Sequence, residues 1–123
     1  MGVYRSYSAS DSTKPDRYDY AVPNEGTAWA FANYEPRVVV LNLGTNGFGS
    51  GNPGQPYVSA YVDFIEHVRA QYATAYFILI DMYGGERLTA LEEVVSSLQG
   101  AGRANAQASP APPRRKTQFA RSA

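Results

Sequence analysis

Two short runs of consecutive aliphatic and aromatic residues dominate the hydrophobic pattern of the chain. They cover residues 38–43 (VVVLNL) and 75–80 (AYFILI), and polar or glycine-rich sequence bounds each of them. Because the apolar residues are successive rather than alternate, the first run predicts a strand that is buried on both faces, as in a parallel sheet, and the second run predicts another buried strand.

The sequence between these runs has the spacing of an amphipathic helix. Residues 56–72 begin with a proline, which suits a first helical turn, and place one apolar face at Tyr57, Tyr61, Phe64, Ile65, Val68 and Tyr72. A strand, a helix and a second strand in this order predict a right-handed parallel crossover. The chain is therefore predicted to be an α/β domain with a mostly parallel sheet.

Two further helices are predicted on either side of this unit. Residues 27–34 (TAWAFANY) favour a short helix that ends before Pro36, with Trp29 in the core. After the second strand, Thr89 and Glu92 form a capping-box pattern that opens a helix through Leu98. Glycines at positions 100 and 102 then end that helix.

Charge divides the chain near Gly102. Residues 1–102 hold six Lys and Arg against all eleven acids (6 − 11 = −5), whereas residues 103–123 hold five basic residues and no acid. We predict a partial α/β domain over 1–102 and a disordered, basic tail rich in Pro, Ala and Arg over 103–123. The acidic body argues against nucleic acid as a partner, and no apolar run has the length of a membrane span.

We predict that the functional site lies in the loop that follows the first strand. Residues 44–54 (GTNGFGSGNPG) are rich in glycine and lie at the carboxyl end of a predicted parallel strand. Ligands of open α/β sheets bind outside these strand ends, where crossover connections leave a crevice.

Part of this loop resembles a known family. Gly44-Thr45-Asn46 after a hydrophobic strand is similar to the Gly-x-Asn-Asp block of SGNH (GDSL-type) ester hydrolases, and most like that of the family-2 carbohydrate esterases, although Gly47 stands where the family usually has Asp. The resemblance implies an incomplete flavodoxin-like, three-layer domain and hydrolysis of short acyl esters, chiefly acetyl esters on carbohydrate.

The resemblance also assigns roles to residues. It implies that the Asn46 amide donates a hydrogen bond to the oxyanion of the tetrahedral intermediate, and that the Gly2 N–H is a second donor. Substrate-binding positions would be Gly44, Thr45, Gly47 and Phe48. No cofactor is implied, and no metal site is expected in a chain with one histidine and no cysteine.

Other parts of the family pattern are missing. The resemblance covers roughly residues 26–100, and neither the Gly-Asp-Ser nucleophile block nor the Asp-x-x-His block is present. Ser12 follows Ser10 and Asp11 but lacks the preceding glycine and strand, and His67 lies mid-helix as an expected surface residue. We therefore expect a fragment, or a degenerate member of the family, that is inactive alone and can self-associate through uncovered sheet edges.

Three alternatives for the function, and one for Asn46, stay open at this point. The chain could be a non-catalytic binding module, or a nonfunctional truncated product. Gly49 to Gly54 also spells G-x-G-x-x-G, although five residues separate it from the strand, which weakens nucleotide binding. Asn46 has a second interpretation as a turn residue that tolerates a left-handed backbone. No compartment is predicted.

Overall fold

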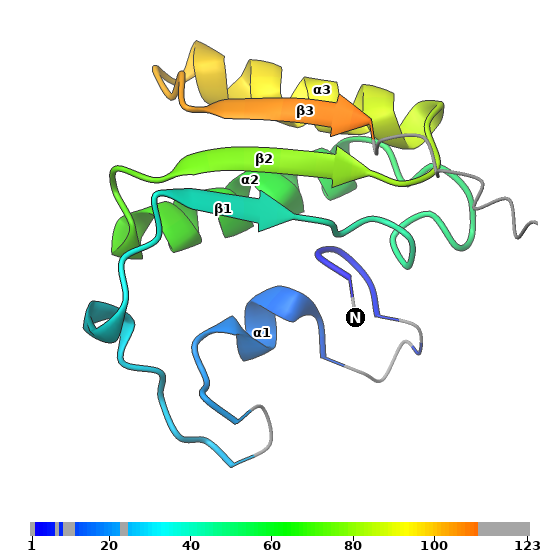
Figure 1. Cartoon of the computed structure of the whole chain (residues 1–123). Helices are drawn as coiled ribbons and strands as arrows, with labels where there is room; N and C mark the ends of the chain where they lie inside the picture. The colour runs from blue at the N-terminus through cyan, green and yellow to red at the C-terminus, as the bar shows by residue number, and fades with distance from the viewer. Residues whose placement is uncertain (1, 7, 9–11, 23–24, 111–123) are drawn as a thin grey trace, which may run out of the picture.

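A computed structural model describes residues 2–6, 8, 12–22 and 25–110. The elements in chain order are α1 (Lys14–Tyr18), the 3-10 helix η1 (Phe31–Asn33), β1 (Val38–Leu41), α2 (Gln55–Gln71), β2 (Tyr76–Asp81), α3 (Glu86–Gly100) and β3 (Ala106–Pro110). The three strands form one parallel sheet in the order β1-β2-β3 (Figure 1). The predicted α/β class and the parallel crossover are confirmed.

The core lies between this sheet and the two long helices. In the register of the sheet, Val39 pairs with Phe77 and Leu41 with Leu79, so these side chains share one face. Helices α2 and α3 pack against each other and cover that face (Figure 1). Large side chains of both helices are fully buried there: Tyr57, Tyr61, Ile65, Val68, Leu91, Val94 and Leu98.

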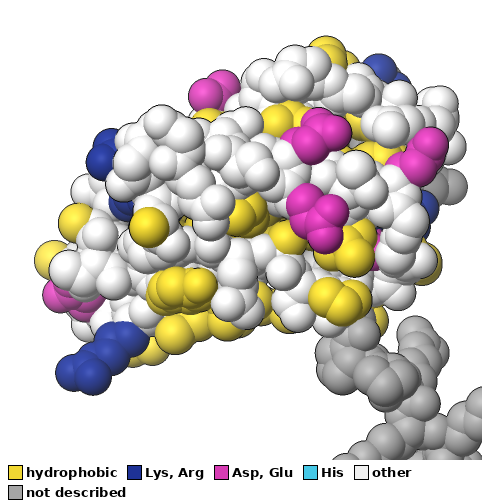
Figure 2. Space-filling view, turned by 90° about the horizontal axis from the view of Figure 1, so that it is seen from above, with side chains coloured by type: hydrophobic (Ala, Val, Ile, Leu, Met, Phe, Trp, Pro, Cys, Tyr) yellow, Lys and Arg dark blue, Asp and Glu magenta, His cyan; other side chains and the backbone are white. Residues whose placement is uncertain are grey.

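The other face of the sheet is open in the described part of the chain. Val38 and Val40 are 50% and 54% exposed, and Tyr76 is 37% exposed. The prediction that the first strand is buried on both faces is therefore wrong, because both long helices lie on the same side. Hydrophobic side chains gather along the lower rim of the molecule in Figure 2, which views it from above relative to Figure 1.

The sequence also placed residues 106–110 in a disordered tail, whereas they form β3 beside β2. The prediction failed because this strand needs no large apolar side chain. Ala106 is small enough to be buried under α3, and backbone pairing with β2 supplies the rest. Proline ends the strand, where its missing N–H is tolerated. The remainder of the predicted tail, 111–123, lies outside the described residues.

Two helix predictions are corrected as well. Residues 27–34 form only the three-residue turn η1, and Trp29 is 41% exposed rather than a core residue. Phe31 packs inward in its place, with its ring between those of Tyr18 and Tyr72. Helix α3 begins at Glu86, one turn before the predicted capping box, because Gly85 adopts a positive φ of 64° and reverses the chain.

Candidate active site

The glycine-rich loop at the carboxyl end of β1 rests on one tyrosine of α2. Tyr57 is 1% exposed, and its hydroxyl donates a hydrogen bond to the Leu43 carbonyl oxygen over 2.9 Å. A Cβ atom on Gly47 would lie 3.0 Å from the Tyr57 ring. Glycine at this position therefore allows the loop to lie directly against the ring.

The surroundings of Tyr57 keep its hydroxyl protonated. Burial raises the pKa of Tyr57 well above its usual range, and the nearby Asp81 charge raises it further. A neutral phenol is a hydrogen-bond donor, so the contact with Leu43 persists at any physiological pH. The ring also meets Phe48 edge to face, with the centroids 5.1 Å apart.

Asn46 lies on this loop with an amide that no described residue binds. The backbone carbonyl oxygen of Asn46 accepts a long hydrogen bond from the Gly49 N–H at 3.5 Å. The Asn46 side chain forms no hydrogen bond with the described residues. Among the described residues, every positive φ belongs to a glycine. Asn46 thus lacks the left-handed backbone that commonly explains an asparagine in a turn.

The structure brings Gly2 next to Asn46. An ideal Cβ on Gly2 would lie 3.3 Å from the Asn46 Cβ, and it would overlap the carbonyl oxygen of Arg5. Gly2 is buried, and its own carbonyl oxygen accepts a hydrogen bond from the Lys14 N–H at 2.7 Å. Gly2 and Asn46, which are far apart in the sequence, therefore lie side by side in the fold, beyond the carboxyl end of β1.

The other predicted substrate-binding residues lie around this pair. Gly44 and Gly47 are partly or fully buried against Tyr57, Thr45 is exposed, and Phe48 is buried by its contact with Tyr57. Their role toward a substrate stays a prediction. Of these four residues, only Phe48 lines the groove beside the loop, together with Gly51, Asn52 and Gly54.

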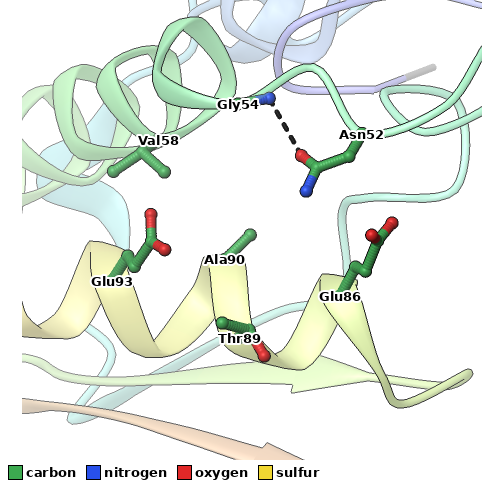
Figure 3. A pocket seen from close by; sticks show the side chains of 7 residues that line it. All are labelled: Asn52, Gly54, Val58, Glu86, Thr89, Ala90 and Glu93. Atoms are coloured by element: carbon green, nitrogen blue, oxygen red, sulfur yellow. Dashed lines mark hydrogen bonds between the residues drawn. The ribbon is translucent and has the colours of Figure 1, made fainter.

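That groove runs between the loop and the start of α3. It holds two adjoining hollows of about 310 and 250 Å³ that share Asn52 and Glu86. In the larger hollow, Glu86 and Glu93 of α3 and Asn52 of the loop surround the opening (Figure 3). The Asn52 side-chain oxygen is engaged by the Gly54 N–H at 2.9 Å.

Sequence reasoning missed the α3 side of this groove. Arg87 stacks on the exposed Tyr83 ring at 4.3 Å and reaches the Phe48 ring at 5.7 Å, which links the two loops. Asp81 accepts hydrogen bonds from the Tyr83 and Gly84 N–H groups, so it holds the turn that places Arg87 there. The sequence signal for it was the turn at Gly84 and Gly85, which follows β2. Because β2 is parallel to β1, this turn and the glycine-rich loop lie at the same end of the sheet.

The chain's single histidine does not join the loop. His67 bonds Asp19 across 2.7 Å, and both side chains are about half exposed. Ser12 is described, whereas Ser10 and Asp11 lie outside the described residues. Within the described residues, no group of three potential metal ligands occurs, and no helix combines the length and apolarity of a membrane span.

Comparison with known sequences gives three curated relatives and no matching family model. Cellulase/esterase CelE of Acetivibrio thermocellus is 44% identical over 62 residues, which are 50% of this chain and 8% of that protein. An acetylxylan esterase / glucomannan deacetylase of Cellvibrio japonicus is 30% identical over 120 residues, covering 83% of this chain and 32% of that protein. The chain thus spans at most about a third of the length of these relatives.

Solved structures match over more of the chain. A family two carbohydrate esterase from Clostridium thermocellum in complex with cellohexaose aligns with a TM-score of 0.81 and 31% identity. The match covers 91% of this chain and 37% of that one. An active site mutant of such an esterase from the same organism aligns with a TM-score of 0.82 and 30% identity.

Proposed function

The homologues and structural neighbours of this chain are family-2 carbohydrate esterases, consistent with an SGNH-type ester hydrolase, and from this premise we propose that it forms the oxyanion side of an esterase active site. The complete domain would hydrolyse acetyl esters on carbohydrate. A serine esterase needs a nucleophile, a base and preorganised donors, and this chain would supply the donors.

The meeting of Gly2 and Asn46 carries this proposal. An unbonded amide and a backbone N–H at the carboxyl edge of a parallel sheet are groups suited to a developing negative charge. Asn52 of the same loop differs from Asn46, because its side-chain oxygen accepts a hydrogen bond from the Gly54 N–H and so closes a local turn. Gly44, Thr45, Gly47 and Phe48 would then form the wall that the acyl or sugar group contacts.

The test is a chimera with a relative. Residues 2–110 would replace the matching segment of the Cellvibrio japonicus acetylxylan esterase / glucomannan deacetylase, whose remaining parts would supply nucleophile and base. We expect the chimera to release acetate from acetylxylan, while the chain alone releases none and takes up no fluorophosphonate label. A folded chimera without activity would contradict the proposal, and so would labelling of any serine in the isolated chain.

Carbohydrate binding without catalysis is the second candidate. One structural neighbour, 27% identical with a TM-score of 0.78, is a carbohydrate esterase whose active site displays divergent catalytic and non-catalytic binding functions. In this chain the groove beside the exposed Tyr83 is the place where a sugar would lie. A folded chimera that binds cellohexaose but releases no acetate would favour this candidate over hydrolysis.

We further propose that two copies of the chain associate through the outer edge of β1. The described residues pair β1 with β2 only, so the outer edge of Val38–Leu41 has no strand beside it. Helix α1 lies on that side of β1 in Figure 1 and would have to move aside for a second copy. A two-fold axis normal to the sheet would align the two copies of β1 antiparallel. The open faces of both sheets would then lie on the same side of the dimer. In the register that we propose, the axis passes beside Val39, so that Val38 of one copy opposes Val40 of the other and the exposed valines of both copies lie together.

This association predicts a specific response to charge. Size-exclusion chromatography with light scattering should give twice the mass of 13.4 kDa, and the V38K/V40K variant should weaken dimerisation by about tenfold or more because lysines would face each other across the edge. The matched control is Val22→Lys, since Val22 is similarly exposed but belongs to none of the three strands. A monomer at every concentration, or equal weakening by Val22→Lys, would contradict the edge model.

A further inference from the structure

The described residues before Val22, which we call the N-terminal segment, are attached to α2 by few contacts. Val3 is 3% exposed in the core, and the Tyr18 ring meets Phe64 edge to face at 5.3 Å. The His67 Nε2 and Asp19 Oδ1 atoms lie 2.7 Å apart. Helix α1 buries no residue fully, so apart from the partly buried Tyr18 ring it has little packing of its own to hold it in place.

The interface between this segment and α2 also borders an open hollow. A hollow of about 440 Å³ lies there, with Val3, Asp19 and His67 among its lining residues. Because the hollow removes apolar contact, the polar pair accounts for a larger share of the attachment. Asp16 and Asp63 face the same hollow, but Asp16 is held by Thr13 and Asp63 forms no hydrogen bond with the described residues.

The segment leads directly to the candidate site. The Lys14 N–H, at the start of α1, donates to the Gly2 carbonyl oxygen at 2.7 Å, and Gly2 lies against Asn46. At the other end of α1, the Asp19 carbonyl oxygen accepts a bond from the Trp29 N–H at 2.7 Å, which fixes Asp19 itself. A restraint on the position of Asp19 therefore also restrains α1 and, through the Lys14 hydrogen bond, Gly2.

We propose that His67 is a positioning residue: its hydrogen bond to Asp19 holds the N-terminal segment on α2 and so keeps Gly2 beside Asn46. We call this His67–Asp19 contact the latch. Its consequence for catalysis rests on the proposed function, but the contact and its effect on the N-terminal segment do not. His67 acts through Asp19 and α1, and it needs no contact with a substrate. The one histidine of the chain thereby acquires a role at the site although it lies outside the loop.

Amide hydrogen exchange of the intact chain tests the latch. In the His67→Ala variant, exchange at Lys14 and Trp29 should accelerate by about threefold to fivefold, the range expected for the loss of one half-exposed polar contact. Exchange at Leu79, in the centre of the sheet, should not change. His67→Gln should restore most of the protection, because a glutamine amide can still donate to Asp19.

Matched variants complete the experiment. Asp63→Asn should leave exchange unchanged, because this carboxylate lines the same hollow without bonding His67. Asp19→Ala should reproduce His67→Ala, and the double variant should open no further than either single one. Unchanged exchange in His67→Ala, failed rescue by Gln, additive effects in the double variant, or equal acceleration at Leu79 would each overturn the latch.

These outcomes are separate from those of the proposed function. Exchange at Lys14 reports the position of the segment whether or not any acetyl ester is hydrolysed. A failed latch would leave the Asn46 assignment standing. An inactive chimera with normal exchange behaviour would overturn the esterase proposal and leave the latch intact.

Discussion

Replacing Asn46 by Ala in the active chimera should lower kcat by about a hundredfold to a thousandfold, the usual effect of removing one oxyanion donor. The size follows from when the donor acts. An amide that pairs with charge present only in the transition state changes turnover, whereas one that also binds the ground state changes KM. We therefore expect KM for acetylxylan to change little, which initial-rate kinetics would measure.

Asn52→Ala is the control for this prediction. Asn52 lies in the same loop, and its side-chain oxygen is already bound by the Gly54 N–H. Its replacement should lower stability by about 0.5–1.5 kcal/mol, the net contribution of one hydrogen bond, and leave kcat within a fewfold. Because Asn52 lines the groove proposed for the sugar, any loss of activity should appear in KM. If instead Asn46→Ala reduces the melting temperature and leaves kcat unchanged, Asn46 serves to stabilise the turn, and its assignment as an oxyanion donor is wrong.

The central unit of the fold could be predicted because its pattern is local. The apolar face of 56–72 repeats with the helical period, and the observed α2, Gln55–Gln71, differs by one residue at each end. The aliphatic run at 75–80 fixed β2 in the same way. Such residues carry their structural information in their own spacing, so no knowledge of distant contacts was needed.

The failures share a different physical cause. Burial of Val38 and Val40 depends on what covers the second face, and β3 is held by backbone pairing and by small alanines. Neither property is visible in local hydrophobicity. Trp29 was misassigned for the same reason, since Phe31 and Tyr18 already occupy the space against Tyr72.

The candidate site was predictable in part. The strand and glycine loop located Asn46, and the resemblance to a known family suggested Gly2. Their proximity is a tertiary fact, because it depends on Val3 and Tyr18 packing onto α2. The groove wall from α3 was missed because it requires two turns to meet at one edge of the sheet, at Phe48 and Arg87.

Truncating Tyr57 should cause the largest loss of stability in the loop region. Tyr57→Ala removes a fully buried ring that supports Gly47 and Phe48, so we expect a loss of about 3–5 kcal/mol in the free energy of unfolding. Tyr57→Phe keeps the ring and loses only the bond to Leu43, which should cost about 1 kcal/mol. Tyr34→Ala, at a 66% exposed position, should stay within about 0.5 kcal/mol.

Urea denaturation followed by tyrosine and tryptophan emission measures these differences. Small domains are stable by only about 5–15 kcal/mol, so Tyr57→Ala could leave too little folded protein for a full curve. Tyr57→Phe then decides, because it tests the Leu43 bond in a chain that still folds. If Tyr57→Phe and Tyr34→Ala cost the same, or Tyr57→Ala costs less than about 1 kcal/mol, Tyr57 does not support the loop. In that case the close approach of Gly47 to the ring would follow from the loop's own conformation rather than determine it.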